Sequence, residues 1–170
     1  DASLREMFHD TYPLRFDLTA RQKPWFDPGR ARNEAFFLAL YGSREAAVRA
    51  TLVTVDGVSP DMPAFRLTET AGVACQFAAA LHEIATLPVD WRPVFSDAAG
   101  SFLWRKIAGT DRLSTHSFGI AFDLNAEIGG YWRWSGRPEG DAGAYDNRIP
   151  PEIVRAFERR GFIWGGKWHH

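Results

Sequence analysis

Hydrophobic residues recur at helical spacing in several parts of the chain. The clearest pattern covers residues 71–86, where the apolar positions fall on one face of a helix. A similar cluster covers residues 33–41, and Ser43 is placed to cap a second short helix directly after it. Residues 151–160 begin with a proline, carry apolar residues on one side and end with two arginines. These patterns predict four helices.

Shorter apolar runs predict strands. Residues 52–55 are rich in β-branched side chains and end at an Asp-Gly turn signal. Three more short runs, over residues 94–96, 120–124 and 162–164, are also consistent with strands. The helices come first, the strands concentrate late, and no regular β-α-β alternation connects them. The expected fold class is therefore α+β, an antiparallel sheet with flanking helices.

Composition and charge argue against nucleic acid and membranes as binding partners. The chain has 170 residues, 45% of them hydrophobic, and we expect a single domain over residues 1–170 that acts as a monomer. With 20 basic and 21 acidic residues, the net charge is −1, so no polycationic surface for nucleic acid is expected. No apolar run approaches the roughly 18 residues of a membrane span. The single cysteine, Cys75, excludes an internal disulfide.

The residues with the clearest chemical potential lie between positions 112 and 124. His116 stands in a polar turn, and Asp123 is a carboxylate within an otherwise apolar run. Burying such a carboxylate is costly unless it is paired or bound to a metal. Gly119 allows the backbone to bend between the two, which would let both side chains reach one cation. His and Asp are ordinary zinc ligands, and a catalytic zinc takes three protein ligands and a water.

The residues alone leave other interpretations open. An aspartate in a strand is more often paired with a nearby arginine than bound to a metal, and a single histidine is more often a hydrogen-bonding group than a ligand. Two candidate ligands do not complete a metal site.

A longer motif supports the metal hypothesis. The spacing Ser114-x-His116-x-x-Gly119-x-Ala121-x-Asp123 resembles the signature of the D-Ala-D-Ala metallopeptidase family, which includes VanY-like D,D-carboxypeptidases and phage-endolysin L-Ala–D-Glu peptidases. Other segments, before and after this motif, also resemble the family and occur in the same order as in the family. Together they span about three quarters of the chain. They are Pro28-Gly-Arg30, Phe36-Phe37, Tyr41-Gly42, Phe102-x-x-Arg105, Ile107-x-Gly109-Thr110, Asn147-Arg-Ile-Pro150 and Gly161-Phe-Ile-Trp-Gly-Gly-Lys-Trp168.

The resemblance implies a hedgehog/D,D-peptidase-like fold and a Zn²⁺ ion held by His116, Asp123 and a second histidine. In relatives, that histidine and the acidic general base follow the Trp-Gly-Gly-Lys-Trp segment. We therefore expect a peptidase domain that is cut short at its C-terminal end, with both residues beyond His170. His169 and His170 do not match the ligand position. Such a chain is expected to bind zinc weakly and to be inactive by itself.

The resemblance also suggests roles for residues around the metal. Arg105 would stabilise the oxyanion that forms at the scissile carbonyl, as a catalytic residue; the alternative is a structural pairing with Asp97 or Asp123. Ser114 would bind substrate or merely cap its turn. Trp132 and Trp168 would line a groove for substrate, although such aromatic residues are more often part of a core.

Together these expectations describe a zinc metallopeptidase that hydrolyses a peptide bond in peptidoglycan stem peptides. The bond cut would be of the D,D-carboxypeptidase or the L-Ala–D-Glu endopeptidase type. The alternative is a catalytically inactive module of the same fold that binds cell-wall peptide. Either protein would work in the cell envelope, periplasmic or secreted, with the stem peptide as its partner.

Overall fold

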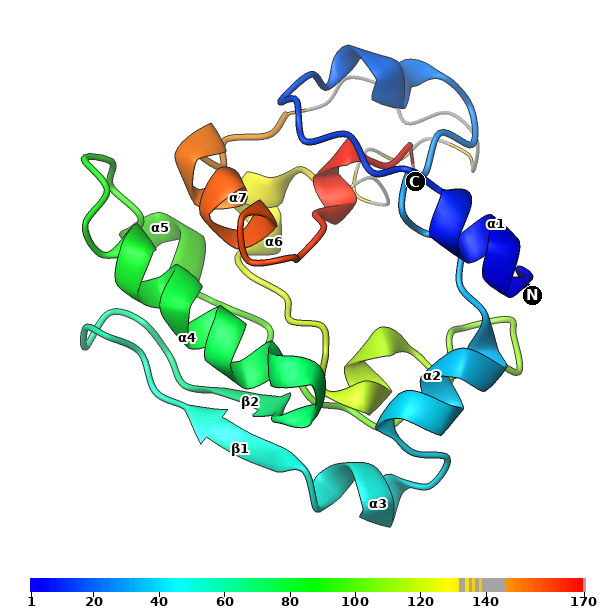
Figure 1. Cartoon of the computed structure of the whole chain (residues 1–170). Coiled ribbons are helices and arrows are strands. Elements are labelled where there is room, and N and C mark those ends of the chain that lie inside the picture. The colour runs from blue at the N-terminus through cyan, green and yellow to red at the C-terminus, as the bar shows by residue number, and fades with distance from the viewer. Residues whose placement is uncertain (132–133, 135, 137, 139–145, 170) are drawn as a thin grey trace.

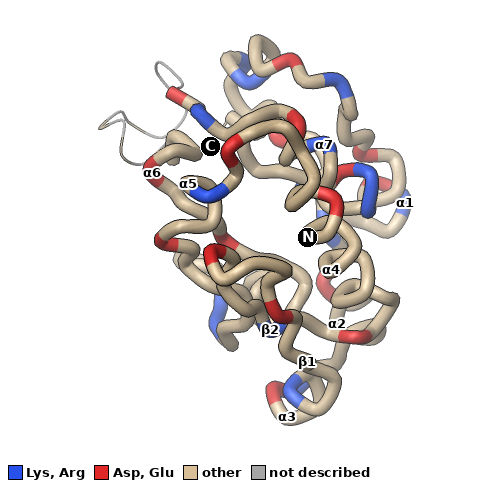
Figure 2. Tube along the Cα trace, turned by 90° about the vertical axis from the view of Figure 1, so that its left-hand side faces the viewer, with Lys and Arg blue, Asp and Glu red and all other residues tan. Residues whose placement is uncertain are grey.

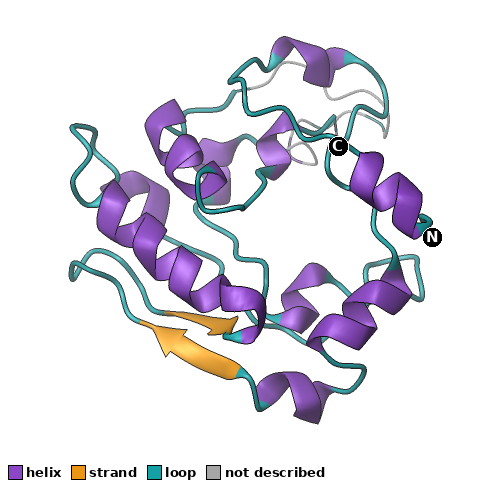
Figure 3. Ribbon diagram, in the orientation of Figure 1, coloured by secondary structure: helices purple, strands orange, loops and turns teal. Residues whose placement is uncertain are grey.

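The computed structural model of the chain describes residues 1–131, 134, 136, 138 and 146–169. Most of its regular structure is helical (Figures 1 and 3). The α-helices are α1 (Leu4–His9), α2 (Glu34–Tyr41), α3 (Glu45–Arg49), α4 (Val73–Ile84), α5 (Arg92–Phe95), α6 (Ala126–Gly129) and α7 (Pro151–Glu158). Short 3-10 helices occupy Thr19–Gln22, Thr70–Gly72, Thr115–Phe118 and Gly165–Lys167. The strands are β1 (Leu52–Val55) and β2 (Phe65–Thr68).

The two strands form an antiparallel hairpin, with Leu52 opposite Thr68 and Val55 opposite Phe65. Helix α4 lies along one face of this hairpin (Figure 1). Its apolar stripe is buried, as the helical spacing of residues 71–86 predicts. Helix α7 packs against α4 from the other side and buries Ile153, Val154 and Phe157. The mixture of helices with a two-stranded antiparallel sheet is compatible with the expected α+β class.

A cluster of aromatic rings fills the space between the hairpin, α4 and α7. Phe77 of α4 is fully buried, and its ring centroid lies 4.6 Å from that of Phe122 and 5.0 Å from that of Phe65. Phe122 also contacts Phe157 of α7, at 4.9 Å. Phe122 therefore anchors its segment in the core, and Asp123 is the next residue in this segment. Aromatic side chains bury large apolar areas, so this anchor is strong.

Three of the expected strands are absent from the described residues. Residues 94–96 fall at the end of α5, because Pro93 stands in the first turn of a short helix there. Residues 120–124 are extended but form only one isolated bridge, between Asp123 and Gly100. Residues 162–164 are irregular, and the Trp164 amide donates to the hydroxyl of Tyr12 rather than to a strand.

Two local expectations also need correction. The second strand of the sheet, β2, was not expected, so the strands lie in the first half of the chain and not late in it. Helix α3 exists, but Ser43 does not cap it. Arg44 occupies the N-cap position and makes no side-chain capping hydrogen bond.

Basic and acidic residues are interspersed along the described chain (Figure 2). Positions of both signs are scattered along the described trace, and the net charge of the chain is −1. Among the described helices, none is both long and apolar enough to cross a membrane.

Candidate metal and catalytic site

His116 is presented by a tight turn that is fixed at both ends. The turn is the 3-10 helix Thr115–Phe118, capped by Ser114, whose hydroxyl accepts the His116 amide at 3.4 Å. Gly119 closes the turn in the left-handed conformation, with φ of +67°. Between them, Phe118 is fully buried and contacts Phe37 and Tyr41 of α2. The apolar neighbour thus holds the turn in the core while His116 faces the partly open side.

Gly119 brings this turn into direct contact with the sheet. Its carbonyl accepts the Thr68 amide at 2.9 Å. A Cβ atom at Gly119 would lie 2.5 Å from Cδ2 of Leu52 and 3.0 Å from the backbone nitrogen of Thr68. The close approach and the positive φ both require glycine here.

The imidazole of His116 and the carboxylate of Asp123 point at one another. Nε2 of His116 lies 3.3 Å from Oδ2 of Asp123. On the opposite side of the ring, Nδ1 lies 2.6 Å from the carbonyl oxygen of Ser101. A carbonyl only accepts, so Nδ1 carries the hydrogen and Nε2 presents its lone pair toward Asp123 when the ring is neutral.

Asp123 belongs to an extended segment that alternates between core and solvent. Phe122 points into the aromatic cluster, and the Asp123 side chain, 58% exposed, points out. The backbone of Asp123 is fixed by two hydrogen bonds: its amide donates to Gly100 at 2.9 Å and its carbonyl accepts from Ala99 at 3.1 Å. The expectation of a buried carboxylate inside a strand was therefore wrong, since the side chain lies at the rim of the core.

The pKa of His116 reflects this placement. Burial of the ring by itself lowers the pKa of His116, and the positive charge of Arg105 acts in the same direction. The hydrogen bond with Asp123, the contact with the Ser101 carbonyl and the charge of Asp123 outweigh both effects. The pKa of His116 is therefore raised above its ordinary value of 6.5.

The pair fits two ligand positions of a zinc site. Ligand atoms at 2.0–2.2 Å from a tetrahedral zinc ion lie about 3.3–3.5 Å apart, and the observed Nε2–Oδ2 separation is 3.3 Å. The carbonyl of Ser101 supplies the second-shell hydrogen bond that orients a metal-binding imidazole. Within the described residues, no group of three His, Cys, Asp or Glu side chains surrounds a common point.

Arg105 lies on an extended segment that runs beside the His116 turn. Its amide donates to the hydroxyl of Ser117 at 2.9 Å, and its carbonyl accepts from the Ser114 amide at 2.9 Å. The residue is exposed, and in the described part of the chain its guanidinium forms no ion pair, with Asp97, Asp123 or any other acid. Its charge is close enough to lower the pKa of His116. Its catalytic role remains a prediction.

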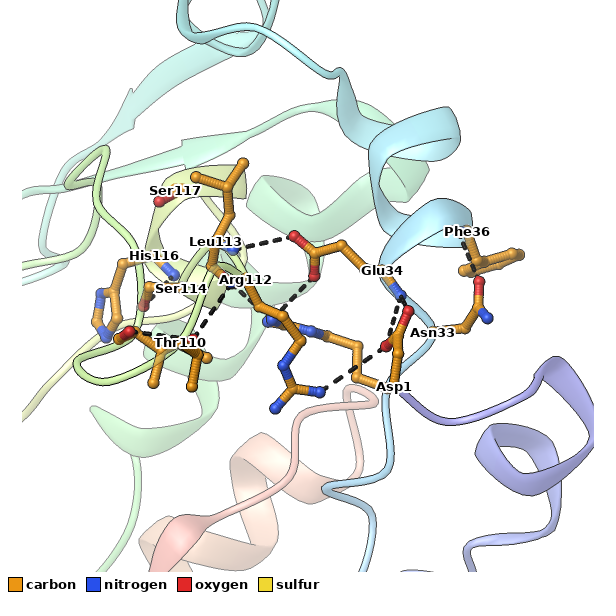
Figure 4. A network of polar contacts seen from close by, with 12 residues as sticks. Asp1, Asn33, Glu34, Phe36, Thr110, Arg112, Leu113, Ser114, His116 and Ser117 are labelled. Carbon is orange, nitrogen blue, oxygen red and sulfur yellow. Dashed lines mark hydrogen bonds and ion pairs between the residues drawn. The ribbon is translucent and has the colours of Figure 1, made fainter.

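An ion pair that the sequence did not suggest holds the loop before the turn. Glu34 accepts the Leu113 amide at 2.9 Å through Oε1, and Arg32 donates to the Leu113 carbonyl at 2.6 Å. The two side chains also pair with each other at 3.1 Å. Figure 4 shows Glu34 reaching from the start of α2 to this loop. Neither residue stands near the motif in sequence, so no local signal pointed to them.

The expected substrate-binding residues have different placements. Ser114 is 5% exposed, and its hydroxyl makes the turn-capping contact described above. Trp168 is half-buried, donates from Nε1 to the Pro28 carbonyl at 2.8 Å and lies under the guanidinium of Arg30. Trp132 lies outside the described residues. Substrate contact by any of the three remains untested.

Comparison with known proteins gives one family match. A family model described as D-alanyl-D-alanine carboxypeptidase matches residues 108–170, a segment that includes His116, Asp123 and Trp168. Over this segment the chain is similar to D-alanyl-D-alanine carboxypeptidases. The match covers less than half of the chain and begins after Arg105. Searches of curated proteins and of solved structures found no match to this chain.

Proposed function

We propose that the protein is a zinc peptidase that cleaves peptidoglycan stem peptides, with His116 and Asp123 as two of its three zinc ligands. The observation that carries the proposal is the 3.3 Å separation of Nε2 and Oδ2, with the far side of the imidazole fixed by Ser101. Two acceptors facing one another at that distance need a cation or a shared proton between them. The match to D-alanyl-D-alanine carboxypeptidases favours zinc.

A zinc ion at this position would lower the pKa of its bound water and polarise the scissile carbonyl. Residues of the chain would position the ligands and bind the developing oxyanion. His116 and Asp123 hold their positions through the turn and the Gly100 bridge. Arg105 forms no ion pair with the other described residues, its charge acts on His116, and it would bind the carbonyl oxygen as negative charge develops on it.

The third ligand and the general base would come from sequence that follows His170, as the family resemblance implies. We further propose the hedgehog/D,D-peptidase-like fold for the complete domain, which the α+β arrangement supports. A stem-peptide substrate places the protein in the cell envelope, periplasmic or secreted.

Zinc titration by calorimetry tests the metal site. We expect weak binding by the 170-residue chain and tight binding by a longer version that continues past His170. In the longer version, Asp123→Asn should weaken binding at least about tenfold, because a neutral amide replaces a charged ligand. Asp56→Asn is the matched control, since Asp56 is exposed at the end of β1. Equal, tight binding by both lengths would show that the ligand set is wrong.

Release of D-alanine from a peptide that ends in D-Ala-D-Ala tests the reaction. The longer version with zinc should hydrolyse this peptide, and removal of zinc by a chelator should stop it. A protein that binds both zinc and the peptide without hydrolysing it would instead be the inactive cell-wall-binding module.

A further inference from the structure

Ser117 is a fully buried polar residue directly after the proposed ligand His116. Its hydroxyl accepts the amide of Arg105 at 2.9 Å. The single hydrogen of this hydroxyl lies within reach of two carbonyl oxygens of the Arg105 segment, that of Arg105 at 2.8 Å and that of Leu103 at 3.2 Å, and the shorter contact to Arg105 is its main acceptor. One side chain therefore contacts three backbone groups of the segment that carries Arg105 and is the acceptor for the Arg105 amide. A buried hydroxyl with this set of partners constrains the geometry around it strongly.

Every second residue from Ser101 to Arg105 forms a hydrogen bond with the His116 turn. Ser101 accepts from the imidazole through its carbonyl, and the Leu103 amide donates to the His116 carbonyl at 3.4 Å. At the third alternate position, Arg105, the side chain of Ser117 takes the place of a backbone partner. In an extended chain, alternate residues direct their backbone groups to the same edge. The position of the Arg105 backbone relative to His116 is thus set by the Ser117 hydroxyl together with the Ser114 amide, which donates to the Arg105 carbonyl at 2.9 Å.

We propose that Ser117 is a positioning residue for the peptidase reaction: it fixes the backbone of Arg105 so that the guanidinium stands beside the His116–Asp123 pair. The proposal rests on the proposed function, in which Arg105 binds the developing oxyanion. The hydrogen-bond partners of the Ser117 hydroxyl are backbone atoms of Arg105 and Leu103, not the side chains of His116 or Asp123. Its effect on the reaction runs through Arg105.

A double-mutant cycle in the zinc-loaded, full-length protein tests this role. With Arg105 present, Ser117→Ala should lower kcat for a D-Ala-D-Ala peptide by about 10- to 100-fold, the effect of a displacement of about 1 Å at a reacting centre. In an Arg105→Ala background, the same substitution should change kcat by less than about twofold, because the group it positions is gone. Zinc affinity should stay within about twofold of the parent value, since the ligands keep their own supports.

Amide hydrogen exchange gives a readout that does not depend on activity. In the metal-free protein, Ser117→Ala should speed exchange of the Arg105 amide by at least about tenfold, because its acceptor is lost. Ser117→Gly should do the same and serves as a second variant. Thr86→Val is the control: it removes a hydroxyl that donates to the Glu83 carbonyl at the end of α4, and it should leave kcat and Arg105 exchange unchanged.

The outcomes separate the two proposals. A parent protein with no zinc-dependent hydrolysis overturns the proposed function, and the role of Ser117 with it. An active parent in which Ser117→Ala lowers kcat by the same factor with and without Arg105 overturns the positioning role alone. Unchanged exchange of the Arg105 amide in both Ser117 variants also overturns it.

Discussion

The ammonium nitrogen of Lys167 lies 2.5 Å from Oε1 of Glu158, and both side chains are almost fully buried. The same carboxylate oxygen accepts the hydroxyl of Tyr12 at 2.6 Å, and Lys167 also donates to the Pro13 carbonyl at 2.7 Å. The Tyr12 hydroxyl in turn accepts the amide of Trp164 at 3.1 Å. This network joins the first part of the chain to α7 and to the segment after it (Figure 1).

Removal of one member of this pair should destabilise the protein strongly. Lys167→Met leaves the Glu158 carboxylate buried without its counter-charge, which costs about 3–5 kcal/mol in comparable buried pairs. Urea unfolding should show this loss. The double variant Lys167→Met/Glu158→Leu should recover most of it, because no buried charge remains. Lys106→Met is the control, since Lys106 pairs with Asp111 on the surface. A Lys167→Met protein as stable as the parent would contradict the buried pairing.

Two glycines with similar backbone conformations allow a second matched test. Gly119 and Gly109 have φ of +67° and +75°, so alanine is strained at either position. A Cβ at Gly109 meets nothing within 4 Å, whereas one at Gly119 meets Leu52 and the Thr68 backbone. Gly119→Ala should therefore cost about 1–3 kcal/mol more than Gly109→Ala in urea unfolding, the usual range for overpacking. Equal losses would mean that Gly119 is needed only for its φ.

The predictable parts of the fold are those in which the local pattern and the tertiary structure agree. The residues of α4 and α7 combine apolar periodicity with suitable end signals, and both helices lie within the expected ranges. The prediction of a strand over residues 94–96 was wrong because three residues are too few to show a period. Pro93, in the first turn of a helix, favours the helix that is observed there. Residues 120–124 do alternate, but only a partner elsewhere in the chain could have made them a strand.

The same distinction applies to the site. His116 and Asp123 could be proposed from the sequence because their residue types and spacing form a motif. Ser101 contributes only its backbone carbonyl to His116, which any residue could supply. Arg32 and Glu34 act through the backbone of Leu113, across about eighty positions of sequence. Contacts of these kinds leave no signature in residue type and follow only from the three-dimensional arrangement.

The raised pKa of His116 predicts a pH dependence for the metal-free protein. A raised folded-state pKa means that the folded protein binds this proton more tightly than the unfolded chain. The stabilisation is complete below pH 6.5 and is lost as pH rises through the folded-state pKa of His116. Chemical denaturation at a series of pH values should show this decline, and Asp123→Asn should reduce it by removing the partner of the proton.

Nuclear magnetic resonance titration of the His116 ring checks the cause directly. The pKa of His116 should lie above 6.5 in the parent and fall in Asp123→Asn. Zinc competes with the same proton, so apparent zinc affinity should weaken as pH falls below the pKa of His116. A parent pKa at or below 6.5 would be inconsistent with the hydrogen bond to Asp123.

Arg105 offers the most specific test of the reaction. If its guanidinium binds the developing oxyanion, Arg105→Ala should lower kcat by about 10²–10³-fold in the zinc-loaded, full-length protein, as for loss of one such donor. Zinc affinity should change little, because Arg105 is not a ligand. In the metal-free protein, the same substitution should raise the pKa of His116, since the charge of Arg105 lowers it.

Lys106→Ala is the matched control for this substitution, because Lys106 is the adjacent cation and its ammonium pairs with Asp111 at 2.8 Å on the surface. It should leave both kcat and the pKa of His116 unchanged. A raised KM with unchanged kcat in Arg105→Ala would assign Arg105 to binding of the ground state instead. If the pKa of His116 also stayed constant, the guanidinium would lie too far from the His116–Asp123 pair to act on the bond that is cut.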